Sequence, residues 1–350
     1  MRQPITPHHS RGQVRHWLTG LLCVLLVCAG APTNVFRARA QTGGGGSSSR
    51  GAGRGAADSS LRRAEATQQP VEAARELDEL VRRATEQACM ERAQDPQGSE
   101  PIDEMQARPS LPLRHPEVLA GTERAERLLP VAKILAAESL RRLLHEHGLT
   151  EAPARAAFAR LAQVRAVKPD MDLRDNASVL YKEPRTIRFG TIFLAGLRSD
   201  EGMISVLAHE LTHVADGAQG TFSALFRGVA RRAKRATPLR LNARRSEELT
   251  CDLVGALAVR AYIARTARVE TLARRTARAL EHNCVARDHT DSAHLSPRST
   301  MRALLALDPQ LALQITGDRL EASAPPSAMP VVRRGRRRAA HRMAPRTPPR

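Results

Sequence analysis

The sequence predicts an α+β protein that is mainly helical, and two observations support this prediction. Apolar residues recur at the three- and four-residue spacing of a buried helix face in several long stretches of the chain. Residues that favour strands cluster only between about residues 164 and 197. A chain of 350 residues can form one large domain or two smaller ones. We therefore expect one small β-sheet among many helices.

Two helices are predicted in the first half of the chain, over residues 61–93 and 116–165, joined by a proline-rich loop over 94–114. The apolar face of the first consists of Leu77, Leu80, Val81, Ala84 and Ala88. The apolar face of the second consists of Leu128, Val131, Ile134, Leu135, Leu140 and Leu144. We expect this helical region, residues 61–165, to act as a scaffold.

Strands are predicted over residues 178–181 and 186–194, which are rich in β-branched and aromatic side chains. They come directly before a predicted helix that starts after Ser199, a favourable N-cap residue. The free edge of such a sheet, next to this helix, can pair with an extended peptide. Residues 222–245 are rich in basic residues and are expected to form either a solvated helix or a mobile lid that steers acidic substrates. Further helices are predicted over residues 247–278, 301–307 and 309–315.

The helix after Ser199 contains the sequence His209-Glu210-x-x-His213. Residues four apart lie on the same face of a helix, so both imidazoles can reach one metal ion. Two His with a carboxylate beside them are typical of a zinc site in which the Glu acts as a general base. We therefore predict one Zn²⁺ per chain, with Glu210 as the base.

A third ligand is expected from a later helix. The pattern that places it six residues after the second His is absent, because Asp216 and Gln219 occupy its positions. Glu248 is the preferred ligand, since Asp252 lies four residues further on and can accept the ring N–H of a ligating His. Glu247 is the rival. Cys251 is either a substitute ligand or a small buried thiol.

These residues resemble a known family. An HExxH motif followed by ExxxD, with a small residue three positions later (here Gly255), is similar to the gluzincin metallopeptidases of the CAAX prenyl protease and heat-shock membrane protease group, especially their soluble exported bacterial relatives. Residues 188–197 resemble the family's substrate-facing edge strand, and residues 294–302 resemble its late segment running from a His to an Arg. Cys251 departs from the family, which commonly has Ala there, and the extra membrane spans are missing.

The resemblance covers about residues 165 to 310 and implies a zincin-like metalloprotease domain, which we place at residues 166–321, with His209, His213 and Glu248 as zinc ligands. It implies a zinc-dependent endopeptidase that hydrolyses peptides or proteins with metal-activated water. A hydrogen-bond donor to the transition state is also expected, and His294 and Tyr262 are the candidates. The alternative is a non-catalytic, zinc-stabilised binding or chaperone-like module of the cell envelope.

The ends of the chain have their own patterns. Residues 1–40 combine basic residues, a short apolar run and an Ala-x-Ala sequence, which is typical of a secretory signal peptide or, if uncleaved, of a membrane anchor. A Gly/Ser-rich linker is predicted over 41–60 and a disordered basic tail over 322–350. We therefore expect an exported protein of the periplasm or cell envelope.

The formal net charge is +19, and Arg supplies all but four of the 55 basic residues. Only 3% of residues are aromatic, which argues against nucleic acid as a partner, since bases stack on aromatic side chains. We expect at most a weak contact of the basic tail with anionic membrane or cell-wall polymer. Export permits a disulfide, for which Cys89 and Cys284 are the best pair.

Overall fold

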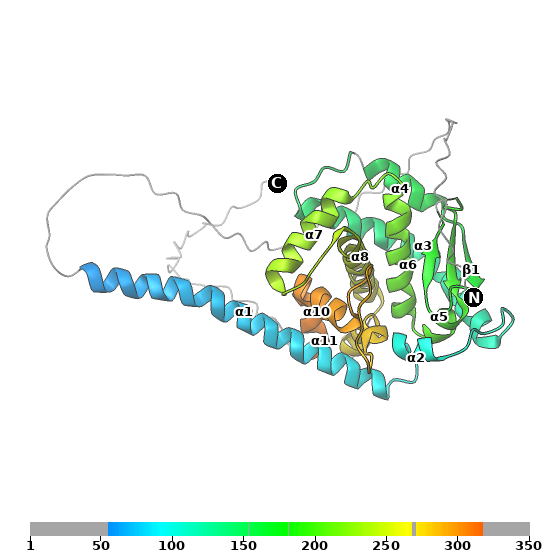
Figure 1. Cartoon of the computed structure of the whole chain (residues 1–350), viewed down its shortest axis with the longest axis horizontal. Helices are drawn as coiled ribbons and strands as arrows, with labels where there is room; N and C mark the ends of the chain where they lie inside the picture. The colour runs from blue at the N-terminus through cyan, green and yellow to red at the C-terminus, as the bar shows by residue number, and fades with distance from the viewer. Residues whose placement is uncertain (1–54, 153, 181, 268–270, 318–350) are drawn as a thin grey trace, which may run out of the picture. The chain divides into compact units, whose positions relative to one another are not determined.

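A computed structural model describes residues 55–152, 154–180, 182–267 and 271–317, with side chains from residue 72 onward (Figure 1). The predicted signal peptide, most of the linker and the basic tail lie outside these residues. The helices are α1 (Gly55–Gln94), α2 (Ile102–Ala107), α3 (Pro116–Glu146), α4 (Ala154–Gln163), α5 (Thr191–Gly196), α6 (Asp200–Asp216), α7 (Ser223–Ala236), α8 (Ala243–Thr266), α9 (Leu272–Arg278), the 3₁₀ helix η2 (Glu281–Asn283), α10 (Pro297–Leu307) and α11 (Pro309–Thr316). The strands are β1 (Ala166–Asp170), β2 (Ala177–Val179) and β3 (Thr186–Gly190). The mainly helical α+β prediction is confirmed.

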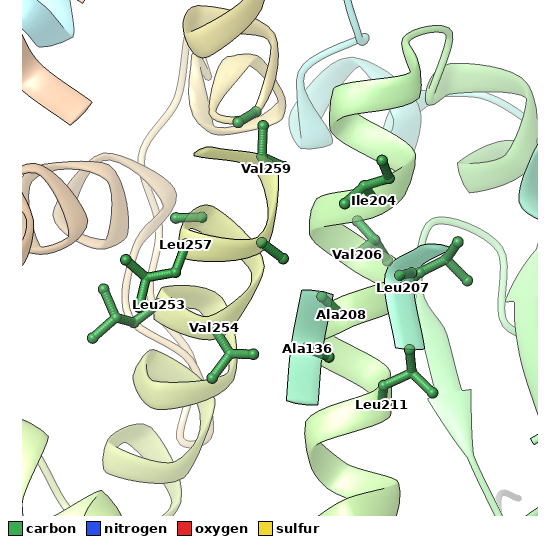
Figure 2. Packing of buried hydrophobic residues seen from close by; sticks show 14 of the residues in the cluster. Ala136, Ile204, Val206, Leu207, Ala208, Leu211, Leu253, Val254, Leu257 and Val259 are labelled. Carbon is green, nitrogen blue, oxygen red and sulfur yellow. The ribbon is translucent and has the colours of Figure 1, made fainter. Parts of the chain in front are cut away.

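Helix α6 lies at the centre of the packing. It contacts α3, α4 and α8, and α3 also packs on α8. Figure 2 shows α6 and α8 side by side, with Leu253 and Leu257 of α8 pointing away from α6. One hydrophobic cluster extends from Val81 to Ile315. Within the described residues this core contains side chains from both 61–165 and 166–321.

The helix predicted over residues 116–165 is two helices. Helix α3 ends at Glu146, and Gly148 follows with a φ of 64°, a conformation that favours glycine and breaks the helix. Two residues of the predicted apolar face are exposed, Val131 at 37% and Ile134 at 58%. The predicted loop between α1 and α3 contains the short helix α2.

The sheet has the strand order β1-β3-β2, with β3 parallel to β1 and antiparallel to β2. The prediction that residues 186–194 are one strand is wrong, because β3 stops at Gly190 and α5 follows. A Cβ on Gly190 would lie 1.9 Å from the carbonyl oxygen of Arg174, so the chain can turn this closely only at glycine. The resemblance placed the substrate-facing edge at residues 188–197, but β3 is the central strand. The edge strand that packs against α6 is β2.

The basic helix predicted over residues 222–245 ends at Ala236, and α8 starts before the predicted residue 247. Asn242 caps α8 by accepting a hydrogen bond from the Arg245 N–H. Helix α8 then ends at Thr266, and α9 forms a separate helix within the range predicted to continue to 278. Among the described residues no helix has the length and apolar character needed to cross a membrane.

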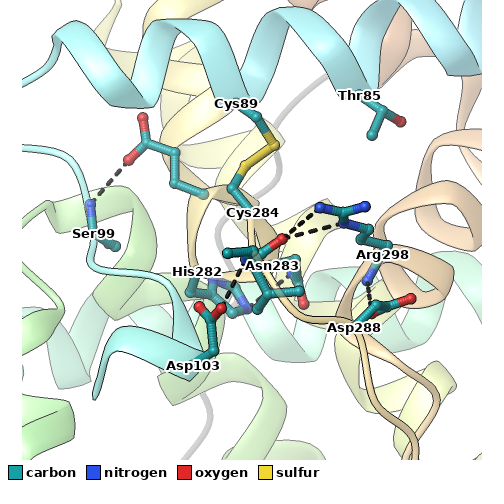
Figure 3. The surroundings of a disulfide bond; sticks show 12 residues. Thr85, Cys89, Ser99, Asp103, His282, Asn283, Cys284, Asp288 and Arg298 are labelled. Atoms are coloured by element: carbon teal, nitrogen blue, oxygen red, sulfur yellow. Dashed lines mark hydrogen bonds between the residues drawn. A yellow bond between two sulfur atoms is a disulfide. The ribbon is translucent and has the colours of Figure 1, made fainter. Parts of the chain in front are cut away.

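The predicted disulfide between Cys89 and Cys284 is confirmed (Figure 3). It joins α1 to the segment after η2, across 195 residues of sequence. The same segment is held by hydrogen bonds from the backbone N–H groups of Ala286 and Arg287 to the carboxylate of Asp103. Residues 281–287 are therefore fixed to the first third of the chain. Cys251 is a buried free thiol.

Candidate metal centre

Helix α6 places His209 and His213 one turn apart on one face. Its N-terminus is formed as predicted, because the Ser199 side chain accepts a hydrogen bond from the Gly202 N–H. On the other face of the helix Ile204, Leu207 and Leu211 are fully buried. The apolar face fixes the rotation of α6 about its axis, so both imidazoles point toward α8.

Helix α8 brings the carboxylate of Glu248 to these imidazoles. The Nε2 atoms of His209 and His213 are 3.2 Å apart. The Glu248 Oε2 atom lies 3.3 Å from Nε2 of His209 and 3.4 Å from Nε2 of His213. The three atoms form a nearly equilateral triangle. Three ligand atoms at the corners of a zinc tetrahedron, each about 2.0–2.1 Å from the ion, are separated by about 3.3 Å, so the donor set fits zinc.

Two more carboxylates contact the imidazoles at Nδ1, the nitrogen that is directed away from Glu248. The Nδ1 atom of His209 lies 2.7 Å from Asp252 Oδ1, and the Nδ1 atom of His213 lies 3.1 Å from Glu247 Oε1. Each ring is therefore oriented through one nitrogen while the other stays directed at Glu248, an arrangement that metal-binding His commonly shows. Glu247, the rival ligand, thus lies on the far side of the ring from the triangle.

The carboxylates also change the protonation of the site. Burial alone would lower the pKa of His209, but Asp252 and Glu248 raise it well above its usual value. Burial would raise the pKa of Glu248, but the two imidazoles lower it. Since His must lose its proton to bind a metal, acid competes with the metal for this site.

Cys251 offers a second donor set. His209, His213 and Cys251 form a group that could hold a metal ion, with ligand atoms within 4.8 Å of one another. The Cys251 Sγ atom, however, lies 3.8 Å from Nδ1 of His213, the nitrogen already engaged by Glu247. We favour the set with Glu248, because there both His contribute Nε2 and the three atoms have the spacing of a tetrahedral face.

Gly255 determines how closely α8 approaches α6. A Cβ at this position would lie 2.6 Å from the carbonyl oxygen of Ser205, so only glycine fits without moving one of the helices. The prediction that Gly255 allows close packing is confirmed. Since Glu248 lies on α8 and both His lie on α6, the lengths of the two sides that end at Glu248 depend on this contact.

We predict that Gly255→Val lowers both zinc affinity and stability. The added side chain forces α8 away from α6, and overpacking of this kind costs about 1–3 kcal/mol of unfolding free energy. Zinc titration and thermal unfolding measure the two effects. Ala264→Val, on the exposed face of the same helix, is the control for introducing a β-branched residue and should leave zinc affinity unchanged. Equal affinities for both variants would contradict the role of Gly255.

A cavity of about 390 Å³ opens beside the triangle. Its wall includes His209, Glu210 and Asp252 from the two helices and Asn176 from the turn before β2. Glu210 is 5% exposed, and its carboxylate has no hydrogen-bond partner among the described residues. Burial raises the pKa of Glu210, although the two imidazoles oppose this shift. A carboxylate of this kind is suited to exchanging a proton with a molecule in the cavity.

The structure brings His294 to the site and places Tyr262 elsewhere. The Nε2 atom of His294 lies 3.7 Å from Glu248 Oε2, and its Nδ1 atom lies 3.0 Å from Asp291 Oδ2. The Tyr262 hydroxyl instead donates to Asp200 Oδ2 at 3.4 Å, at the start of α6. Of the two candidate donors, His294 lines the cavity and Tyr262 does not.

Sequence reasoning missed part of the cavity wall. His282, Asn283, His289 and Asp291 line the cavity, but they lie in η2 and in loops without a recognisable motif. Burial lowers the pKa of His282 to about 4, so this ring is neutral near pH 7. The only sequence signal was the neighbouring Cys284, whose disulfide holds this segment against the rest of the protein.

Comparison with models of protein families, with curated proteins and with solved structures gave no significant match to this chain.

Proposed function

We propose that this protein is a zinc-dependent endopeptidase related to the gluzincins. The observation that supports this most strongly is the triangle formed by His209 Nε2, His213 Nε2 and Glu248 Oε2, with sides of 3.2–3.4 Å. Beside it lies a buried carboxylate, Glu210, which forms no hydrogen bond or ion pair with a described residue. The three ligands by themselves would be consistent with a structural metal site. A structural site, however, does not need an additional carboxylate such as Glu210 that can act as a base.

In the proposed reaction His209, His213 and Glu248 hold the ion. When bound, zinc supplies a Lewis acid that acidifies water and polarises a peptide carbonyl. Glu210 accepts one proton from the water whose oxygen attacks the carbonyl carbon, and then donates it to the amide nitrogen as the C–N bond breaks. The immediate products are a carboxylic acid and an amine, and transfer of the acid's proton to the amine gives a carboxylate and an ammonium group.

His294 is proposed to assist by donating from Nε2 to the oxygen that becomes negative in the transition state. Asp291 fixes the orientation of this ring through the contact of its Oδ2 atom with Nδ1 at 3.0 Å. The free edge of β2 lies beside α6, and residues 173, 175 and 176 before it line the cavity. We propose that an extended substrate pairs with this edge and so crosses the site.

We also propose that the protein is exported. Disulfides persist in oxidising compartments and are rare in the cytosol of most organisms. The Cys89–Cys284 bond supports an envelope or periplasmic location, in agreement with the signal-like sequence of residues 1–40.

Removal and return of the metal tests the proposed function. The full chain is incubated with a mixed peptide library and cleavage is followed by mass spectrometry, before and after dialysis against a zinc chelator. We expect cleavage that disappears with the chelator and returns on addition of one equivalent of zinc. Bound zinc without any cleavage would support the alternative, a zinc-stabilised binding module, and no zinc at all would exclude both.

A further inference from the structure

Helix α7 has a cluster of exposed basic side chains on its outer side, which we call the α7 basic face: Arg227, Arg231, Lys234 and Arg235. Their spacing of three and four residues places them on one side of the helix. The other side is apolar and buried, and it packs against α8 and α10 (Figure 1). The side chains buried there include Leu225, Phe226, Val229 and Ala233.

Helix α7 is also anchored by a polar contact. The Arg232 guanidinium donates to the carbonyl oxygen of Leu307 at 2.6 Å and forms an ion pair with Glu146 at 3.3 Å. The helix is thus held from the protein side by both apolar packing and a charged contact. Its basic face is consequently directed outward.

Among the described residues no carboxylate forms an ion pair with the α7 basic face. The sequence contains no Asp or Glu from residue 217 to residue 246. None of the four side chains forms an ion pair with a described residue, whereas Arg188 contacts both Asp170 and Glu183. Glu146, which reaches α7, is already engaged by Arg142 and Arg232. Like charges on successive helix turns repel, so this arrangement weakens the helix rather than stabilising it.

We propose that the α7 basic face docks the protein on an anionic lipid membrane. Clustered Lys and Arg side chains are attracted to anionic headgroups. Because the apolar side of α7 is buried in the protein, the contact is electrostatic and involves no insertion into the bilayer. The face has no aromatic side chain, which makes it a poor surface for single-stranded nucleic acid. The proposal does not depend on the zinc site.

Sedimentation with vesicles tests the proposal. The full chain is mixed with vesicles of neutral phosphatidylcholine or of phosphatidylcholine with 30% phosphatidylglycerol, at low and high salt. We expect binding only to the anionic vesicles and weaker binding at high salt, where charges are screened. The variant Arg227→Gln, Arg231→Gln, Lys234→Gln, Arg235→Gln should lose at least about tenfold in partition coefficient, given the usual contribution of each basic residue. Because Gln is a good helix former and these positions are exposed, the variant should fold, and circular dichroism checks this.

A matched control removes the same charge elsewhere. Arg155, Arg165, Lys168 and Arg185 are exposed and, like the α7 set, comprise three Arg and one Lys. In contrast to the acid-free sequence around α7, carboxylates lie close to these residues in the sequence, with Asp170 two residues from Lys168 and Glu183 two residues from Arg185. Their replacement by Gln should change binding less than twofold. Equal losses in both variants would mean that only net charge or the basic tail matters, and would overturn the proposal. Binding to duplex DNA without binding to anionic vesicles would overturn it as well.

Discussion

Replacing Glu210 with Gln is expected to abolish peptide hydrolysis while leaving zinc bound. Gln has nearly the same shape as Glu but cannot accept the proton of the attacking water. General-base catalysis contributes about 10²–10⁴-fold to rates, so the cleavage rate should fall by at least two orders of magnitude. The measurement is the initial rate of cleavage of a peptide identified in the library experiment, with the zinc content of the same sample.

The matched control for this variant is Glu126→Gln, the same chemical change at an exposed position on α3. It should cleave at the wild-type rate. Full activity of Glu210→Gln would mean that another group accepts the proton. Loss of zinc along with activity would mean that Glu210 maintains the centre rather than acting as the base.

Replacing Glu248 with Ala is expected to weaken zinc binding by more than about a hundredfold. The change removes one corner of the triangle, whereas loss of a group that only orients a ligand costs about 10–100-fold in metal affinity. Competition with a chromophoric zinc chelator at fixed pH measures the dissociation constants. Lowering the pH should weaken binding to the wild type, because the pKa values of both His are raised and protons compete with zinc.

Two neighbours on the same helix provide the comparison. Glu247→Ala removes the carboxylate behind His213 and should cost less than Glu248→Ala. Cys251→Ser should change the affinity by no more than a few-fold, since its sulfur lies beside Nδ1 of His213 rather than Nε2. A larger loss for Cys251→Ser than for Glu248→Ala would identify the thiol as the third ligand.

The helices of the site were predictable because their signals are local. Ser199 at the N-cap, the apolar spacing of Ile204, Leu207 and Leu211, and the two His four residues apart all act within one helix. The choice of Glu248 over Glu247 followed from Asp252 one turn later, and that carboxylate does contact His209. The matching role of Glu247 behind His213 was missed, since it depends on how α8 crosses α6.

Other features depend on contacts between distant segments. Residues 191–196 have the composition of a strand, yet the close approach of Gly190 to the backbone of Arg174 turns the chain into a helix. His282 lines the cavity because a disulfide and hydrogen bonds hold its segment there. Tyr262 could have been excluded from the sequence, since fourteen residues of helix separate it from Glu248 by about 21 Å.

The central claim is that two His and Glu248, and not Cys251, hold a zinc ion. X-ray absorption at the zinc edge of the purified full chain tests it most directly, because Zn–S bonds are about 2.3 Å long and Zn–N and Zn–O bonds about 2.0–2.2 Å. We predict about one zinc per chain, two imidazole nitrogens, further light atoms at the shorter distance, and no sulfur. A sulfur neighbour at about 2.3 Å, or a protein that retains no zinc, would contradict the claim.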